Sequence, residues 1–355
     1  MHFSPERIGK SQLSERARRP AASRCRRPFS SSATRILVAA IGAVAVALTL
    51  PALASASYGY GWPIKPFGQA HPVRGQLNDP RMNGADFYSS SSHSFHFGLD
   101  IAAPDGKAVY AVAPGWVHYL SSSAIAVREP NDVTTFSYWH IRPVAKRGKK
   151  VKLHALLGYI ERGYGHVHFA EKRDDRYVNP LRRGGLTPYI DTTRPTISSV
   201  SYYDTAYHDL TSATLSGTVK LAVSAFDTPQ MASTWPWAVV TPSSLVWQIF
   251  DAGGKPVLDG QWDLGIFLCP LDPLAVFAPG TLKNNFVKNV IVEGTYDYWL
   301  GEPWDTTSVA NGAYSLVVTA ADIRGNQMAK TVDFNVANDP LAVTPAPPAS
   351  SSAAG

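Results

Sequence analysis

The sequence predicts an all-β protein with two folded regions, and three observations support this prediction. The 355 residues, 45% hydrophobic and 17% charged, are enough to bury one or two ordinary cores. Short apolar stretches separated by glycine and polar residues run from about residue 95 to 180, and none keeps a helical apolar period over three turns. Longer stretches of alternating polar and apolar residues follow a proline-containing linker at 191–195.

The first region has the pattern of an antiparallel sheet. Its short apolar stretches are bounded by turn residues and rich in β-branched and aromatic side chains, as strands are. They lie at residues 109–112, 116–120, 124–127 and 135–139. The preceding segment, 58–92, is rich in Gly, Pro and Ser, so we expect it to be irregular.

The second region has the pattern of a β-sandwich. Residues 219–223 and 314–320 alternate as half-buried strands do, and residues 332–336 keep the same period. The stretch 312–326 resembles the last two strands of bacterial immunoglobulin-like or fibronectin-like modules. We expect residues 267–305 to form long loops or insertions.

The two ends of the chain differ from the folded regions. Residues 1–56 combine basic residues, the uncharged run 36–50 and small residues before a cleavage point after Ala56, or earlier after Ala54, which is the order of a signal peptide. The run is short for a spanning helix, which needs about 20 residues, so a retained anchor is the alternative. We therefore expect a secreted or wall-associated protein that touches the membrane only transiently.

The predicted domains are a signal peptide at 1–56, a first domain with its approach segment at 57–190, a second domain at 191–337, and a disordered Pro/Ala/Ser tail at 338–355.

The net charge of +6 comes from the leader. Residues 1–56 hold nine Lys/Arg and two Glu, which leaves 24 basic and 25 acidic residues in the rest of the chain. A folded part that is close to neutral does not favour nucleic acid as a partner.

Histidine is concentrated between residues 93 and 168, which hold seven of the ten. Two short patterns stand out there, HFGLD from His96 to Asp100 and HVH from His166 to His168. Alternate side chains of a strand share a face, so the paired histidines should point the same way, and His96 and Asp100 also match in parity. We expect both patterns to line one side of a sheet.

Two imidazoles and one carboxylate suit a catalytic zinc site. Three such ligands leave the fourth tetrahedral position open for water, whereas a closed structural site typically uses thiolate, and no cysteine lies between residues 93 and 168. Zinc lowers the pKa of bound water and polarises a carbonyl. Histidines beside the metal can then move protons or donate a hydrogen bond to an oxyanion.

Three motifs together resemble the LytM/lysostaphin-type zinc peptidoglycan endopeptidases. They are SFHFGLDIAAPDGKAVYAVAPGWV at 94–117, YWHI at 138–141, and the stretch 158–160 leading to GHVHF at 165–169. They occur in the family's order, and the resemblance covers roughly residues 60–190. It implies a compact antiparallel β-sheet metallopeptidase domain of the duplicated hybrid motif type.

The resemblance also implies roles for individual residues. His96, Asp100 and His168 would bind Zn²⁺, and His140 and His166 would take the catalytic places beside the metal. The substrate would be stem peptides or cross-bridges of bacterial peptidoglycan. No expected ligand is missing from the sequence.

The predicted function is therefore that of a secreted zinc metalloendopeptidase that hydrolyses peptide bonds in peptidoglycan. The loop before the paired histidines, 161–165, is shorter than the family often has, which bears on substrate choice more than on metal binding. One alternative is a non-catalytic protein that binds the cell wall or activates a hydrolase and retains the metal site. Another is an adhesin whose working part is the β-sandwich.

Other chemically capable residues are expected to be structural. His93, His118 and His154 lie outside the motif positions, and Tyr138 should pack rather than react. We expect Arg74, Asp79 and Arg81 to form a turn with solvated charges, with a contact to a substrate carboxylate as the alternative. Trp235 and Trp237 should pack in a loop, with stacking on sugar rings as the alternative.

Overall fold

The computed structural model describes residues 59–82, 93–210, 214–229, 238–287 and 290–338. Nearly all of its regular elements are strands, and the one α-helix within these ranges is the single turn α1 (Pro273–Val276). The predicted all-β class is thus confirmed. No helix in these ranges has the length and apolar character needed to cross a membrane. The predicted signal peptide, the tail beyond Asn338, and the Trp235–Trp237 loop lie outside the described residues.

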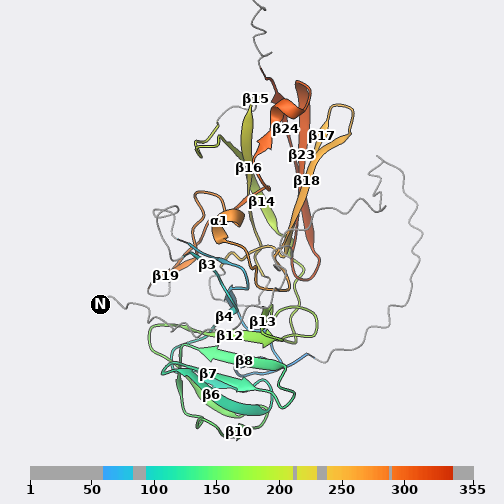
Figure 1. The fold of residues 1–355 in the computed structure, drawn as a ribbon. Helices are drawn as coiled ribbons and strands as arrows, with labels where there is room; N and C mark the ends of the chain where they lie inside the picture. The colour runs from blue at the N-terminus through green and yellow to red at the C-terminus, as the bar shows by residue number, and fades with distance from the viewer. Residues whose placement is uncertain (1–58, 83–92, 211–213, 230–237, 288–289, 339–355) are drawn as a thin grey trace, which may run out of the picture.

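The first region is built on one large antiparallel sheet, in the order β1-β4-β12-β8-β7-β6-β10, with β13 paired to β12. Figure 1 shows β12 on the side of this sheet that faces the C-terminal strands. The bounds are β1 (Val73–Gly75), β4 (Leu99–Ala102), β6 (Gly115–Ser121), β7 (Ala124–Arg128), β8 (Thr134–Trp139), β10 (Lys150–Val151), β12 (His166–Arg173) and β13 (Arg176–Val178). Strands therefore form where the sequence predicts them at 116–120, 124–127 and 135–139.

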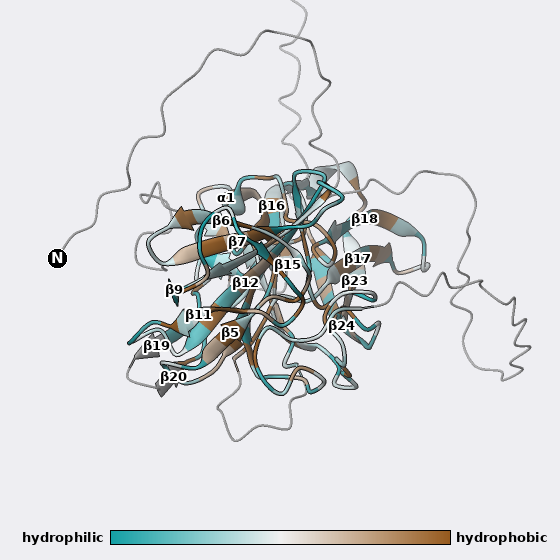
Figure 2. Cartoon of the chain, turned by 90° about the horizontal axis from the view of Figure 1, so that it is seen from below, coloured by the Kyte–Doolittle hydropathy of each residue, from teal (hydrophilic) through white to brown (hydrophobic). Residues whose placement is uncertain are grey.

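A smaller sheet, β5-β11-β9, completes the first region. Its strands are β5 (Ala108–Tyr110), β9 (Ile141–Pro143) and β11 (Leu156–Ile160). Apolar side chains of both sheets, such as Val109, Val127 and Leu157, form one buried cluster. Figure 2 shows the brown, apolar residues of β5 and β7 that contribute to it. This core holds the strands of the large sheet in place beneath the site described below.

The second region contains two sheets that share a second buried cluster. One sheet has the order β14-β16-β21 with β22 beside β16, and the other has the order β15-β24-β23-β17-β18. The bounds are β14 (Thr196–Tyr203), β15 (Thr214–Leu215), β16 (Thr218–Phe226), β17 (Ser244–Asp251), β18 (Pro256–Asp263), β21 (Asp297–Trp299), β22 (Trp304–Asp305), β23 (Gly312–Ala321) and β24 (Gln327–Val336). Alternate residues of β23, from Tyr314 to Ala320, are buried, as the period-two pattern predicts.

Two segments are more ordered than the sequence indicates. The approach segment contains β1 and β2 (Pro80–Arg81), and β2 pairs with β3 (Ser94–Phe95). The stretch 267–305 contains α1, β21, β22 and the hairpin of β19 (Asn285–Val287) with β20 (Val290–Val292). The irregular structure expected for both was therefore wrong in part, because pairing with other strands orders short segments that have no clear period of their own.

The approach segment also joins the two regions. Met82 and Phe95 belong to the buried cluster of the second region, where Phe95 packs against Phe277. Asn78 donates hydrogen bonds to the carbonyls of Leu264 and Phe267, both at 2.8 Å. The chain that leads into the HFGLD motif is thus fixed from both sides.

Candidate metal centre and active site

Two neighbouring strands place the chemically capable residues of the site on one face of the large sheet. In the antiparallel pair β4–β12, His168 lies opposite Asp100 and His166 lies opposite Ala102. Because His166 and His168 are two positions apart on β12, their side chains leave the same face. The same-face prediction for the paired histidines is therefore correct.

The even spacing of His96 and Asp100 suggests that both lie on one face of a single strand, but the structure places His96 before the strand that carries Asp100. His96 follows β3, and Phe97 and Gly98 turn the chain before β4 begins at Leu99, so His96 and Asp100 do not share a strand. A Cβ atom at Gly98 would lie 2.6 Å from the Phe169 carbonyl oxygen and 2.9 Å from His168 Nε2. Only glycine lets this turn approach β12 closely enough for His96 to face Asp100.

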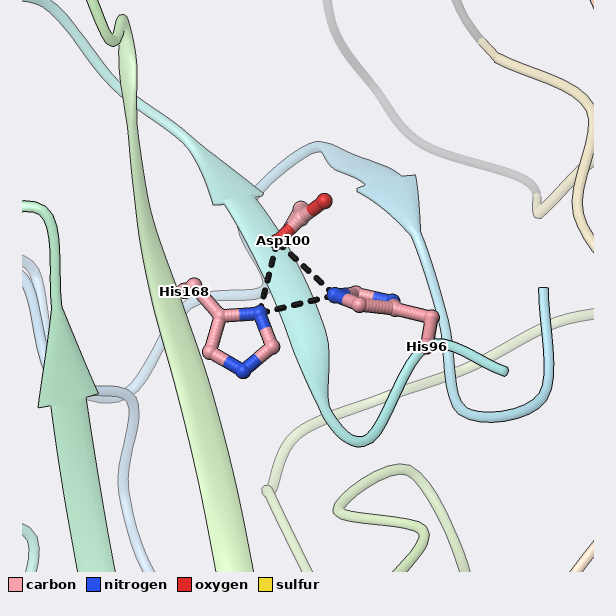
Figure 3. A group of neighbouring side chains, drawn as sticks. All are labelled: His96, Asp100 and His168. Carbon is pink, nitrogen blue, oxygen red and sulfur yellow. Dashed lines mark hydrogen bonds and ion pairs between the residues drawn. The ribbon is translucent and has the colours of Figure 1, made fainter. Parts of the chain in front are cut away.

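Three side-chain atoms converge at the centre of the site. His96 Nε2 lies 3.1 Å and His168 Nδ1 lies 3.0 Å from Asp100 Oδ1, and the two nitrogen atoms are 2.7 Å apart. Figure 3 shows both imidazoles turning these nitrogen atoms towards the carboxylate. All three residues are buried, at 4%, 8% and 4% exposure for His96, Asp100 and His168. Within the ranges described, they form one of two groups close enough to hold a metal ion.

The donor set fits zinc. Tetrahedral coordination with metal–ligand bonds of about 2.05 Å separates neighbouring ligand atoms by roughly 3.3 Å. The two nitrogen–oxygen distances are close to this value, and the nitrogen–nitrogen distance of 2.7 Å is shorter. A carbonyl can only accept a hydrogen bond, so His96 Nδ1, 2.8 Å from the Gln76 oxygen, carries the proton and Nε2 keeps its lone pair for a metal. Burial lowers the pKa of His168 and lowers that of His96 to about 3, so both rings are neutral, as metal ligands must be.

Asp100 is held in its ionised form. Burial alone would raise its pKa, but the neighbouring imidazoles of His96, His166 and His168 lower the pKa well below its usual range. The other carboxylate oxygen, Oδ2, accepts a hydrogen bond from Arg81 Nη2 at 2.9 Å. Arg81 therefore orients the carboxylate and balances its charge.

His166 and His140 lie beside these three residues. His166 Nδ1 donates to the Tyr164 carbonyl at 2.8 Å, so its Nε2 carries a lone pair and lies 3.5 Å from Asp100 Oδ1. The His140 ring is 4.7 Å from that of His166 and stacks on Tyr164, with centroids 4.2 Å apart and planes at 15°. Burial first, and then the neighbouring His166, lowers the pKa of His140 to about 4.

His140 and Tyr164 are less buried than the three residues of the centre. His140 is half-buried and has a left-handed backbone, with φ of 62°, which turns the chain between β8 and β9. Tyr164 is 40% exposed. The short loop that carries it is pinned by Asp105, whose two carboxylate oxygens accept from Gly163 N and Gly165 N at 2.7 and 2.8 Å.

The remaining candidates lie away from the centre or act behind it. His118 is an exposed residue of β6, His154 stacks on Phe67 with ring centroids 3.8 Å apart, and His93 comes just before β3. Tyr138 is fully buried, and its hydroxyl accepts from Val112 N at 3.0 Å, so the prediction that it packs is correct.

The expectation of solvated charges in the approach segment was wrong. Asp79 is fully buried, with its carboxylate accepting from Thr241 N and Gln76 N, both at 2.8 Å. Arg74 donates to the Gly165 carbonyl at 3.2 Å, and Arg81 contacts Asp100 as described above. Strand pairing on both sides of this segment removes it from solvent.

Sequence reasoning missed the residues that support the centre. Gln76 holds His96 through a backbone carbonyl, which no residue type signals. Tyr164 positions both His140 and His166, and Arg81 pairs with Asp100. The basic side chain in the approach segment was a usable signal for Arg81, but only the fold shows that it contacts a carboxylate of the protein itself.

Comparison with known proteins agrees with this geometry. Residues 94–180 match the sequence model of Peptidase family M23. This part of the chain is therefore an M23 peptidase domain, and the family resemblance indicated by the three motifs is confirmed. Among curated proteins, none matches the chain.

Several solved structures are similar to about a third of the chain. They include a zinc-containing peptidase from Vibrio cholerae (21% identity, 34% of this chain and 39% of that chain, TM-score 0.29). Others are the catalytic domains of lysostaphin from Staphylococcus simulans (22%, 33% and 78%, TM-score 0.22) and of the prophage-encoded M23 protein EnpA from Enterococcus faecalis (27%, 33% and 95%, TM-score 0.25). The match thus spans less than half of the Vibrio cholerae chain.

Proposed function

We propose that this protein is a secreted, zinc-dependent endopeptidase that hydrolyses peptide bonds in the stem peptides or cross-bridges of bacterial peptidoglycan. The observation that supports this most strongly is the convergence of His96 Nε2, Asp100 Oδ1 and His168 Nδ1 within an M23 peptidase domain. The resemblance of the three motifs to LytM/lysostaphin-type enzymes supports the substrate class.

The three converging residues would hold Zn²⁺, which when bound polarises a scissile carbonyl and lowers the pKa of water. His166 serves as the proton acceptor, because its Nδ1 proton is fixed on the Tyr164 carbonyl and its Nε2 lone pair faces the centre. A neutral His140 retains one N–H group, which it donates to the oxygen of the scissile carbonyl as charge develops there. Stacking on Tyr164 holds the His140 ring beside that of His166.

Release of new amino termini from purified peptidoglycan tests the activity. The full chain should release them, a chelator should abolish release, and added zinc should restore it. His118→Ala, which alters an exposed histidine of β6, is the matched control and should retain full activity. Binding of peptidoglycan without any release by the zinc-loaded chain would overturn the proposal in favour of the non-catalytic alternative.

Export is tested separately by sequencing the amino terminus of the protein recovered outside the cell. We expect it to begin at Ser57, or at Ser55 if cleavage follows Ala54. A full-length chain that stays inside the cell would contradict the secretion proposal and leave the proposed chemistry untouched.

A further inference from the structure

A second group of close side chains lies where the linker meets the second region. Asp191, Asp227 and Asp322 each place one carboxylate oxygen within 4.8 Å of the others. Asp191 precedes β14, Asp227 directly follows β16, and Asp322 directly follows β23. Their exposed fractions are only 5%, 3% and 5%. Three carboxylates from distant parts of the sequence are therefore buried together.

Two of these carboxylates are fixed by hydrogen bonds from their own loops. Asp322 Oδ1 accepts from the backbone nitrogen atoms of the three residues 324–326, at 2.6 to 2.8 Å. Asp191 Oδ1 accepts from Thr193 N at 3.0 Å and from Thr193 Oγ1 at 2.6 Å. Asn326 Nδ2 joins the two segments by donating to Asp322 Oδ2 and to the Asp191 carbonyl. The group is thus held in place before any ligand arrives.

Asp227 differs from the other two. Its Oδ1 is buried and has no hydrogen-bond partner in the part of the chain that the structure describes. Within the same part, no lysine or arginine forms an ion pair with Asp227. The nearby Arg324 guanidinium instead donates to the Tyr189 carbonyl at 2.9 Å and lies 4.7 Å from the centre of that ring. A buried carboxylate oxygen without a partner is costly and points to a missing cation.

The electrostatics point the same way. Burial first, and then the charges of Asp191 and Asp322, raise the pKa of Asp227 to about 8. Like charges this close disfavour one another unless a cation lies between them. A divalent ion would offset most of the combined charge of three carboxylates.

We propose that Asp191, Asp227 and Asp322 bind one Ca²⁺ ion. The donor set consists of oxygen atoms alone, which are the ligands that calcium prefers, whereas zinc prefers nitrogen and sulfur. Calcium takes six to eight oxygen ligands in flexible geometry, so water and backbone carbonyls would complete its coordination. Because β16 and β23 belong to different sheets, the ion would fasten the linker to both sheets of the second region at once.

Calorimetric titration of the zinc-loaded full chain with CaCl₂ in calcium-free buffer tests the site directly. We expect one Ca²⁺ per chain with a dissociation constant below about 1 mM. The variant Asp227→Asn keeps the size of the side chain and should weaken binding by about tenfold or more. The control Asp259→Asn makes the same charge change on an exposed residue of β18 and should bind as the wild type does.

Thermal unfolding distinguishes lost binding from lost folding. Calcium should raise the melting temperature of the wild type and of Asp259→Asn but not that of Asp227→Asn. Without calcium and at a pH above the Asp227 pKa of about 8, Asp227→Asn should melt at or above the wild type, because it removes a charge that Asp191 and Asp322 repel. Absence of saturable binding by the wild type, wild-type affinity in Asp227→Asn, or equal affinity for Mg²⁺ would each overturn the calcium assignment.

Discussion

The two carboxylates Asp100 and Asp227 occupy comparable positions in the two regions, yet their surroundings have opposite effects. Both are buried members of a group of potential metal ligands. Around Asp100 lie imidazoles, which bring its pKa well below the usual range despite burial, and Arg81 contacts its carboxylate. Around Asp227 lie two further carboxylates, and its pKa rises to about 8. Burial alone therefore does not decide whether a carboxyl group is ionised. The charges and hydrogen-bond donors of the neighbouring side chains decide it.

The two groups of potential ligands therefore differ in what offsets their negative charge and in the ion that their ligand atoms prefer. In the first group, His96, Asp100 and His168, the carboxylate charge is offset by neighbouring side chains of the protein itself, and the nitrogen ligands favour a transition metal such as zinc. The second group is built from oxygen atoms alone and depends on a hard cation from solution. The two sites should therefore respond independently to changes in ligands and in metal.

The largest expected effect comes from His168→Ala. Removing one of three proposed ligands should reduce peptidoglycan hydrolysis by about 1000-fold or more, because the residue both binds the metal and sets its geometry. Zinc content, measured by elemental analysis of the purified protein, should fall with it. Calcium titration of the same variant should match the wild type, and a changed calcium affinity would mean that the two sites are coupled.

A smaller loss is expected for His166→Ala, which leaves all three proposed ligands in place. Turnover should fall by about 100-fold through loss of the proton acceptor, while zinc content stays close to the wild type. Steady-state kinetics and metal analysis on one preparation give both values. Loss of zinc together with activity would show that His166 binds the metal rather than moving protons.

Gly98→Ala tests whether the turn between β3 and β4 assembles the first group. The added Cβ would collide with the Phe169 carbonyl and with the His168 ring, so we expect a loss of about 1 to 3 kcal/mol in unfolding free energy. Gly68→Ala is the control, since its Cβ would meet no atom within 4 Å. Urea denaturation of both variants measures the difference, and equal stability would contradict the role given to Gly98.

The smallest effect in this series concerns the charge beside Asp100. Arg81→Met removes the hydrogen bond to Asp100 Oδ2, and zinc affinity should weaken by about tenfold, as it does when residues that orient ligands are replaced. Competition with a chelating dye measures it. Arg128→Met, whose ion pair with Asp132 is exposed, should leave the affinity unchanged. An unaffected Arg81→Met protein would show that imidazoles alone orient the carboxylate.

Sequence alone was sufficient for the all-β class, and it singled out the three residues that the fold brings together in the first group. Period-two alternation and turn residues are local properties, so β6, β7, β8 and β23 form close to where the sequence predicts them. The HFGLD and HVH motifs each place their chemistry within five residues. Their two strands pair directly, which brings His168 opposite Asp100.

Tertiary structure alone decided how these residues are supported and where the second group forms. His96 meets Asp100 through the turn at Gly98 and not by lying on the same strand. Arg81 reaches Asp100 because the approach segment pairs with β3 and β4. Asp191, Asp227 and Asp322 are separated by 36 and 95 residues, and no local pattern joins them. Only the folding of the linker against two sheets makes them neighbours, since contacts between distant segments depend on the packing of the whole chain.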